Sequence, residues 1–258
     1  MLKHVLITGA AGAIGGAIAR ELGARHPGVR LSLVDVDEAG LARAAAALPS
    51  SSPVTVHRWD LSAPDALVGP YQSLVAALGP VDGLVNCAGI MDVRSVVGMP
   101  WDAARRVLDV DLVSPLRLMS LAAPAMAAAG AGVIVNVSSM AGRVPLRGCA
   151  YYGGAKAGLA MASEIAHLEL APRGVHVVTV YPGPVASALE RGARSQLRPS
   201  VIARLMPTGD ADRIGALIAR AIARGEPRVV YPPLYALADR AVGVASWVTR
   251  RFSPAPAV

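Results

Sequence analysis

Three side chains near the middle of the chain have the types and spacing that proton transfer to an alcohol oxygen requires. Tyr152 and Lys156 are four residues apart on an Ala-rich helical stretch, so their side chains share one face. A free tyrosine has a pKa near about 10, and a neighbouring ammonium group lowers it by stabilising the phenolate. Ser139, at the end of a buried strand, can hydrogen-bond an oxygen on which charge develops. The three residues predict general acid/base chemistry on an alcohol or a ketone.

Tyr152 and Ser139 each have a neighbour of the same type. Tyr151 precedes Tyr152, but only Tyr152 has a lysine four residues later and Ser139 thirteen residues earlier. Ser138 precedes Ser139, and we expect it to satisfy local backbone groups. Taken singly, a tyrosine or a lysine on a helix is usually a solvent-facing side chain. The prediction therefore depends on the combination and on the cofactor motif upstream.

A glycine-rich segment at residues 8–15 follows the first apolar run and precedes helical sequence. In such a turn the first glycine permits the tight bend, the second lets backbone approach a pyrophosphate, and the third lets the helix pack on the strand. The helix, expected to begin near Ala13, presents its amide groups and positive dipole end to the phosphates. The predicted cofactor contacts are Gly9, Ala11, Gly12, Ala13, Ile14 and Gly15.

Asp35 predicts which dinucleotide binds. It ends the second apolar run, twenty residues after Gly15, where a carboxylate can accept hydrogen bonds from the adenosine ribose hydroxyls. The same carboxylate repels the extra phosphate of NADP, and Ala10, Ala11 and Val36 offer no compensating arginine. NAD is therefore the predicted cofactor. The alternative is that Asp35 is an ordinary strand-end residue.

The elements that position these residues are seven apolar runs rich in β-branched residues, separated by Ala-rich helical stretches. Because the runs are continuously apolar, both faces of each strand are expected to be covered, as in a parallel sheet. The sequence predicts a single α/β domain over residues 1–258, a doubly wound, Rossmann-type, seven-stranded parallel sheet with helices on both faces. Ligands then bind at the carboxyl ends of the strands. The runs are residues 4–9, 30–37, 54–61, 82–89, 132–139, 175–183 and 228–233.

Taken together, these motifs resemble the short-chain dehydrogenase/reductase family from about residue 3 to residue 232. The resemblance implies an adenine-contact pair, a strand end of the NNAG type and a segment that contacts the nicotinamide amide, and it includes Tyr152 and Lys156 among the cofactor contacts. It also implies a homo-oligomer, dimer or tetramer, paired through helices around residues 100–129 and 152–171. The further contacts implied are Asp60 and Leu61, Asn86, Ala88 and Gly89, and Pro182, Gly183, Val185 and Ser187.

Two residues depart from the family pattern. Cys87 replaces the second Asn of the NNAG segment, a small substitution that preserves the strand end. Asp111 stands where the family usually has the Asn that supports a proton-relay water near the lysine. Asp111 is predicted to be a catalytic support residue if that support comes through its backbone carbonyl. Its carboxylate could instead pair with Lys156 and alter the effect of the lysine on Tyr152.

Residues 188–207 are predicted to form a substrate loop, and residues 234–258 form a C-terminal extension. The loop is amphipathic, and its arginines either contact an acidic substrate group or are solvated. The stretch 234–252 has apolar residues near helical spacing and ends in paired arginines. It could be a subunit contact, a cover over the substrate site or an interfacial membrane helix; packing within the protein or its oligomer is the simplest interpretation. The apolar loop residues are Leu189, Leu197, Val201, Ile202, Leu205 and Met206, and the arginines are Arg191, Arg194, Arg198 and Arg204.

The composition of the chain argues against several other classes of function. The formal net charge is +7, but the basic residues are dispersed and only three Trp, six Tyr and one Phe are present, which argues against nucleic-acid binding. The five histidines lack ligand spacing, so no metal is expected. Two cysteines suit a reducing cytosol, and a cytoplasmic location is the default. The charge-free run 118–142 is expected to lie in the core because Pro124, Gly130 and Gly132 interrupt it.

The sequence therefore predicts an NAD(H)-dependent oxidoreductase that moves a hydride between nicotinamide and a secondary alcohol or ketone. The substrate is expected to be an apolar or amphipathic small molecule, given the apolar residues of the loop. The alternative is a non-catalytic NAD-binding regulator or scaffold, which Asp111 favours and the intact Ser139, Tyr152 and Lys156 oppose.

Overall fold

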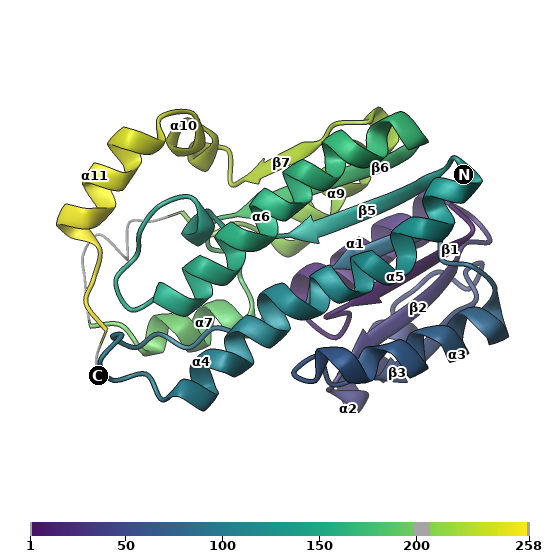
Figure 1. The fold of residues 1–258 in the computed structure, drawn as a ribbon, viewed down its shortest axis with the longest axis horizontal. Coiled ribbons are helices and arrows are strands. Elements are labelled where there is room, and N and C mark those ends of the chain that lie inside the picture. Colours follow the sequence, from purple (N-terminus) through teal and green to yellow (C-terminus); the bar gives the residue numbers. More distant parts are fainter. Residues whose placement is uncertain (1, 199–206, 257–258) are drawn as a thin grey trace.

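Seven parallel strands form one sheet in the order β3-β2-β1-β4-β5-β6-β7 (Figure 1). The computed structural model describes residues 2–198 and 207–256. Because the interior strands are buried on both faces, their residues are apolar without alternation, and the predicted doubly wound sheet is confirmed. The strands are β1 (His4–Thr8), β2 (Arg30–Asp35), β3 (Val54–Arg58), β4 (Gly83–Asn86), β5 (Gly132–Val137), β6 (Val175–Pro182) and β7 (Arg228–Tyr231).

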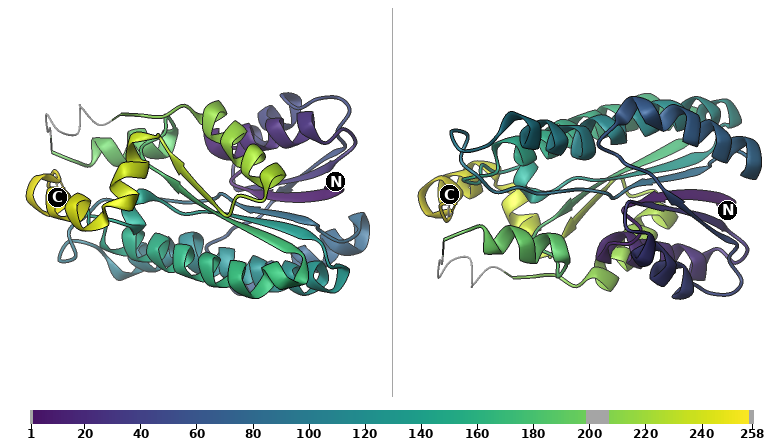
Figure 2. Two further views of the ribbon diagram at one scale, coloured as in Figure 1. Left: turned by 90° about the horizontal axis from the view of Figure 1, so that it is seen from above. Right: turned by 90° about the horizontal axis from the view of Figure 1, so that it is seen from below.

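Helices cover both faces of the sheet, which Figure 2 shows as a layer between two helical layers. One face is covered by α1 (Ala13–Arg25), α2 (Glu38–Ala46) and α9 (Ala211–Arg224), and the other by α3 (Val68–Leu78), α5 (Ser114–Ala129) and α6 (Ala150–Leu170). Polar side chains cap two of these helices: Asp37 accepts a hydrogen bond from the Gly40 amide, and Asp210 accepts one from the Arg213 amide. The remaining elements are α4 (Trp101–Leu108), α7 (Ala188–Ser195), α10 (Leu234–Arg240) and α11 (Val242–Phe252), with the short turns η1 (Pro64–Leu67), η2 (Asp109–Val113), η3 (Met140–Gly142) and η4 (Ala171–Arg173).

Successive residues of β1 enter opposite halves of the core. Val5 and Ile7 pack in the cluster that includes α1 and α9, whereas Leu6 packs in the cluster that includes α3 and α5. All three side chains are fully buried. Burial of each such side chain contributes about 1.5–3 kcal/mol, so the two apolar layers hold the carboxyl edge of the sheet in place.

The direction of strand order reverses between β1 and β4. Gly9 follows β1 with a φ of +68°, and a Cβ placed on it would lie 2.7 Å from the Ala88 backbone, which follows β4. Only glycine permits this close approach. The two strand ends thus meet at the position where doubly wound sheets bind their ligands.

The apolar run 118–142 divides into parts of α5 and β5. Gly130 ends α5 in the left-handed conformation, with φ at +64°, and β5 then forms a central strand between β4 and β6. The longer segment Trp101–Ala129 meets the length and composition of a membrane span, but in the fold α5 packs against β4, β5, β6 and α6. The run contributes to the α/β core, as predicted.

Candidate active site

A cavity of about 1190 Å³ lies beyond the carboxyl ends of the strands. It joins the glycine turn after β1, the ends of β2, β4, β5 and β6, and one face of α6. The structure brings most of the predicted site residues to this one cavity. Those that line it are Gly9, Ala11, Gly12, Ala13, Ile14, Gly15, Asp35, Asp60, Leu61, Ala88, Gly89, Ser139, Tyr152, Lys156, Pro182, Gly183, Val185 and Ser187.

The glycine turn leaves no room for side chains at Gly9 and Gly15. A Cβ on Gly15 would collide with the carbonyl oxygen of Gly9, so α1 packs directly on the turn. The Ala11 amide donates to Asp35 Oδ2 at 3.1 Å, which ties the turn to the end of β2. Because this backbone lies at the start of α1 and borders the cavity, the residues fit a dinucleotide pyrophosphate.

Two carboxylates stand at the far end of the same cavity. Asp35 Oδ1 accepts hydrogen bonds from the amides of Val36 and Asp37, at 2.8 and 3.2 Å, so its orientation is fixed. Asp60 is exposed, and the amide and hydroxyl of Ser62 hold its pKa below the usual value by donating to its carboxylate. The end that would receive adenosine therefore carries two carboxylates, with Arg58 and Arg106 near enough to Asp60 to lower its pKa further.

Thr8 is a structural residue of the site that the sequence analysis did not assign. Its hydroxyl donates to the Val85 carbonyl and accepts from the amides of Cys87 and Ala88, at 3.1 and 3.3 Å. Through these hydrogen bonds the Thr8 side chain connects the end of β1 to the end of β4. A hydroxyl residue directly before Gly9 at a strand end was the signal available in the sequence.

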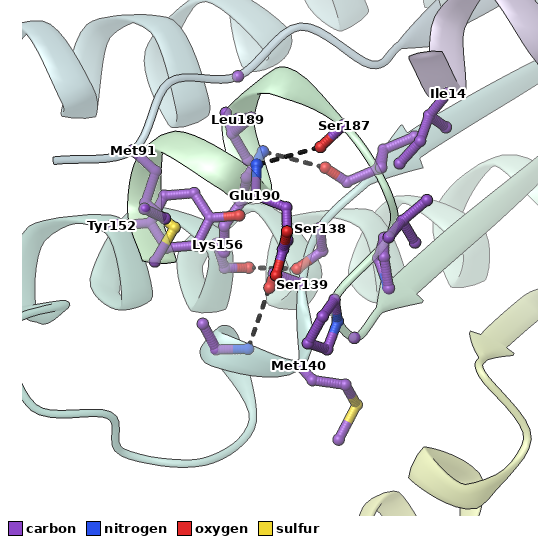
Figure 3. Close-up of a pocket in the computed structure, with 18 of the residues that line it drawn as sticks. Ile14, Met91, Ser138, Ser139, Met140, Tyr152, Lys156, Ser187, Leu189 and Glu190 are labelled. Carbon is purple, nitrogen blue, oxygen red and sulfur yellow. Dashed lines mark hydrogen bonds between the residues drawn. The ribbon is translucent and has the colours of Figure 1, made fainter. Parts of the chain in front are cut away.

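Ser139, Tyr152 and Lys156 converge as predicted, and Figure 3 shows the Tyr152 phenol directed toward Ser139. The Ser139 hydroxyl accepts a hydrogen bond from the Ala141 amide at 3.1 Å, which orients it at the end of β5. Lys156 Nζ lies 5.9 Å from the centre of the Tyr152 ring and donates to the Val137 carbonyl at 3.1 Å. A phenol, a hydroxyl and an ammonium group thus face one space.

Close backbone packing fixes Ser139 relative to the helix that carries Tyr152. A Cβ on Gly142, in η3, would lie 2.7 Å from the Ala157 nitrogen of α6, and one on Gly153 would lie 2.9 Å from the Ala141 carbonyl oxygen. The Ser138 hydroxyl donates to the Lys156 carbonyl at 2.7 Å. Ser138 therefore satisfies local backbone, as expected, while it also borders the cavity.

The pKa of Tyr152 lies above its usual value, although Lys156 acts to lower it, as predicted. Burial is the largest cause, since the side chain is only 7% exposed. The Lys156 ammonium and the hydrogen bond from Ser139 both lower the pKa, but the negative charge of Asp111 raises it. The lysine acts in the predicted direction, and desolvation outweighs it.

Asp111 pairs with Lys156 through its side chain. Its Oδ1 lies 2.9 Å from Lys156 Nζ, and its Oδ2 accepts from the Ile90 amide at 3.2 Å. Asp111 is fully buried in the π-helical turn η2 and is separated from the cavity by Gly89, where a Cβ would lie 2.6 Å from Oδ1. Burial lowers the pKa of Lys156, but Asp111 and Tyr152 together raise it above the usual value. Of the two possibilities for Asp111, the structure shows the ion pair.

The Asn86 side chain does not line the cavity, and the contact of this residue with the cofactor stays a prediction. Its side chain is buried and donates to Asn136 Oδ1 at 2.8 Å and to the Pro115 carbonyl at 3.3 Å. It joins β4 to β5 and to the start of α5. Side chains alternate along a strand, so Asn86 at the end of β4 points into the helical layer rather than beyond the edge.

The C-terminal stretch covers the substrate end of the cavity. Leu234, Tyr235 and Leu237 of α10 and Val244 and Val248 of α11 line it. Tyr235 packs on the segment after β6, because a Cβ on Gly183 would lie 2.7 Å from its ring. Of the three interpretations of this stretch, the position of α10 and α11 along the cavity fits a cover, while the subunit contact and the membrane helix stay predictions.

The predicted substrate loop is described only in part. Ser187 caps α7 by accepting the Glu190 amide at 3.1 Å, and Leu189, Arg191, Arg194 and Leu197 line the cavity. Arg194 also pairs with Glu190 at 2.5 Å, so its charge is balanced within the helix. Arg198 is exposed, and its amide donates to the Ala255 carbonyl. Val201, Ile202, Arg204, Leu205 and Met206 lie outside the described residues.

Comparison with known proteins agrees with this geometry. The family model described as short chain dehydrogenase matches residues 3–198. Galactitol 2-dehydrogenase of Agrobacterium fabrum is 34% identical over 185 residues, 71% of this chain and 70% of that protein. Cyclohexanol dehydrogenase of an Acinetobacter species is 29% identical over 223 residues, 84% and 86% of the two chains.

A solved structure shows the same architecture over nearly the whole length. The short-chain dehydrogenase of Sphingobium yanoikuyae, in complex with NADPH, superposes with a TM-score of 0.81 at 28% identity and covers 96% of each chain. The family match, the seven-stranded parallel sheet and the cavity at its carboxyl edge all indicate the same class of protein. The chain belongs to the short-chain dehydrogenase family, oxidoreductases that act on alcohols and ketones with a nicotinamide cofactor.

Proposed function

We propose that the protein is an NAD(H)-dependent oxidoreductase that transfers a hydride between nicotinamide and a secondary alcohol or ketone of an apolar or amphipathic small molecule. One observation carries the proposal. A single cavity connects the glycine turn and Asp35 at one end with Ser139, Tyr152 and Lys156 further along. The cavity extends from the end of β2 to α10, which leaves room for a dinucleotide beside a substrate.

Asp35 supports NAD over NADP. The carboxylate is held by three amides and borders the cavity together with Asp37, so the ribose end carries negative charge. A ribose hydroxyl donates to such a carboxylate, whereas a ribose phosphate is repelled by it. Asp60 and Leu61 would contact the adenine, and the segment from Pro182 to Ser187 would contact the nicotinamide amide.

The chain's own residues handle the proton. When bound, nicotinamide supplies the hydride acceptor for an alcohol or the hydride donor for a ketone. Tyr152 removes the hydroxyl proton during oxidation and returns one to the oxygen during reduction. Lys156 stabilises the phenolate by its charge, and Ser139 donates a hydrogen bond to the substrate oxygen. Asp111 does not touch the reacting atoms and acts through Lys156.

Apolar walls favour an apolar substrate. Met91, Val144, Leu146 and Leu189 line the cavity with the side chains of α10 and α11. A pocket of this kind stabilises hydrocarbon rather than a polyol, because unpaired hydroxyl groups lose their hydration there. Among the relatives, an alcohol such as the one in the name of cyclohexanol dehydrogenase fits these walls better than galactitol.

Replacing Tyr152 by Phe tests the proposal. With cyclic and branched secondary alcohols as substrates and NAD as cofactor, Tyr152→Phe should lower kcat by about 10²–10⁴-fold, while the variant still binds NADH. Tyr151→Phe is the matched control, because Tyr151 packs against Trp101 and should keep full turnover. NADH binding by the wild-type protein without turnover of any alcohol or ketone would instead favour the NAD-binding regulator.

We also propose that the protein is a homo-oligomer paired through α6. Met161, Ile165 and Leu168 recur at helical spacing on its outer face and are 60%, 46% and 73% exposed. An apolar stripe of this kind is typical of a subunit contact. Ile165→Glu should lower the mass measured by light scattering to that of a monomer, and an unchanged mass would refute pairing through this face.

A further inference from the structure

The strongest feature outside the catalytic groups is the outer surface of α10 and α11. We propose that this surface, residues 234–252, docks on an anionic lipid surface and that the mouth of the cavity faces the lipid. The docking is independent of the proposed reaction. Only the supply of an apolar substrate from the lipid would rest on the proposed function.

Both helices expose large apolar side chains. Leu234, Leu237, Val244 and Trp247 are 60–65% exposed, and Val248 and Phe252 are just above 40%. None of the described residues of α10 and α11 is fully buried, although Tyr235 and Ala238 pack against a core cluster. Helices of 7 and 11 residues are marginal in water without packing. A surface of this composition gains free energy when another apolar phase covers it.

The positive charge of this surface favours anionic lipid as the apolar phase that covers it. Arg240, Arg250 and Arg251 are exposed. Asp239, the one acidic residue in the stretch 234–252, is instead bound to Arg143 at 2.9 Å and Arg228 at 3.1 Å. The outward charge of the two helices is therefore positive. A second copy presenting the same face would be repelled, whereas anionic lipid headgroups would be attracted.

The arrangement of side chains suits a helix lying on a membrane. Trp247 and Phe252 are in edge contact at 6.3 Å, and the Arg251 guanidinium lies 5.5 Å from the Phe252 ring. Aromatic rings beside arginines are typical of the interface between headgroups and acyl chains. An 11-residue helix is about 16 Å long, roughly half the hydrocarbon thickness, so α11 can lie on the surface but cannot span it.

The cavity reaches solvent through the same surface. Leu234, Leu237, Val244 and Val248 line the cavity and are 41–65% exposed, so they form an apolar rim where it opens. Figure 1 shows α10 and α11 beyond the carboxyl edge of the sheet, at one end of the molecule. With that end on a bilayer, the apolar mouth would open into lipid rather than water. This is the geometry by which a membrane-dissolved molecule enters a pocket without crossing water.

Vesicle co-sedimentation of the full chain tests the docking without any turnover. Vesicles of phosphatidylcholine containing phosphatidylglycerol should bind the protein, vesicles of phosphatidylcholine alone should bind it far less, and added salt should release it. Arg250→Gln with Arg251→Gln should weaken binding roughly 30-fold. Trp247→Ser should weaken it roughly 10-fold and remove most of a lipid-induced blue shift in tryptophan emission.

Two matched controls locate the contact. Trp101→Ser replaces a tryptophan of equal exposure on α4, and Arg220→Gln with Arg224→Gln removes the same charge from α9. Both should retain binding, with circular dichroism confirming that each variant is folded. Equal binding by all variants, no preference for phosphatidylglycerol, or a solution dimer abolished by Trp247→Ser would overturn the proposal. None of these results would affect the proposed reaction, which the Tyr152 variant tests separately.

Discussion

The carboxylate of Asp111 and the ammonium group of Lys156 form a buried ion pair, with 2.9 Å between Oδ1 and Nζ. Neither side chain is more than 4% exposed. The pair lies next to Tyr152, whose pKa responds to both charges in opposite directions. The proton affinity of the phenol is thus set by a balance among burial, one positive charge and one negative charge.

Asp111→Asn should move the pH profile of alcohol oxidation to lower pH. Burial is the main reason that the pKa of Tyr152 is raised, and the charge of Asp111 raises it further. Oxidation needs the phenolate, so its rate rises with pH through that pKa. Removing the negative charge lowers the pKa and brings the rise to lower pH. The measurement is kcat/KM against pH for both proteins, and a profile that stays or moves upward contradicts the assignment.

Lys156→Met should destabilise the fold by about 3–5 kcal/mol, because it leaves Asp111 buried without a partner. Burial raises the pKa of Asp111, and loss of the lysine raises it more. A carboxyl whose pKa is higher in the folded state stabilises the fold at pH below its unfolded pKa. That stability is lost as pH rises through the folded pKa.

Urea unfolding at two pH values measures this effect. The deficit of Lys156→Met should be larger near about pH 8 than near about pH 5, where protonation of Asp111 relieves it. The double variant Asp111→Leu, Lys156→Met removes both charges and should recover most of the lost stability. A deficit of the same size at both pH values would show that the pair is not the cause.

Replacing Asp35 should change the cofactor preference. Asp35→Ser with Val36→Arg removes the repelling carboxylate and adds a cation, so NADP should bind at least about tenfold more tightly and NAD about tenfold more weakly. Asp35→Asn is the control for structure, since its amide oxygen can still accept from the Ala11 amide. Fluorescence titration with NADH and NADPH gives both constants. Tighter binding of NADPH than of NADH by the wild-type protein would refute the NAD proposal.

Two adjacent glycines of α6 should respond differently to alanine. A Cβ on Gly153 would lie 2.9 Å from the Ala141 carbonyl oxygen, so Gly153→Ala should displace η3 and with it Ser139. A misplacement of about 1 Å can lower kcat up to about 10²-fold. A Cβ on Gly154 meets no atom of the described chain within 4 Å, so Gly154→Ala should add about 0.5–1 kcal/mol of stability and leave kcat unchanged. Equal kcat values for the two variants would show that the packing of η3 on α6 does not determine the position of Ser139.

The sheet and most of the cavity could be predicted from the sequence because both follow from local patterns. Continuous apolar runs indicate strands covered on both faces, and strand ends of a parallel sheet share one edge. The positions of Asp35, Ser139 and Pro182 at that edge required only the ends of the runs. The need for glycine at position 15 could be predicted from the spacing of the glycine turn alone, and the structure shows that a Cβ there would collide with Gly9.

Side-chain direction and burial could not be predicted in the same way. Asn86 and Cys87 are adjacent at a strand end, yet Asn86 points into the helical layer while Cys87 lines the cavity. The raised pKa of Tyr152 depends on desolvation, which is a property of the packed fold. Apolar spacing in residues 234–252 indicated a face that needs covering, but it left a subunit contact, a cover over the substrate site and a membrane helix as alternatives, whereas the fold places the stretch along the cavity.

The reacting groups and part of the cavity wall come from different segments of the chain. The groups lie at the end of β5 and on α6, and that part of the wall lies on α10 and α11. The reacting groups lie within residues 139–156, whereas residues 234–248 supply a separate part of the cavity wall. Substitutions confined to α10 and α11 would therefore change the wall of the cavity without touching Ser139, Tyr152 or Lys156. The same hydride-transfer reaction can thereby be applied to different substrates.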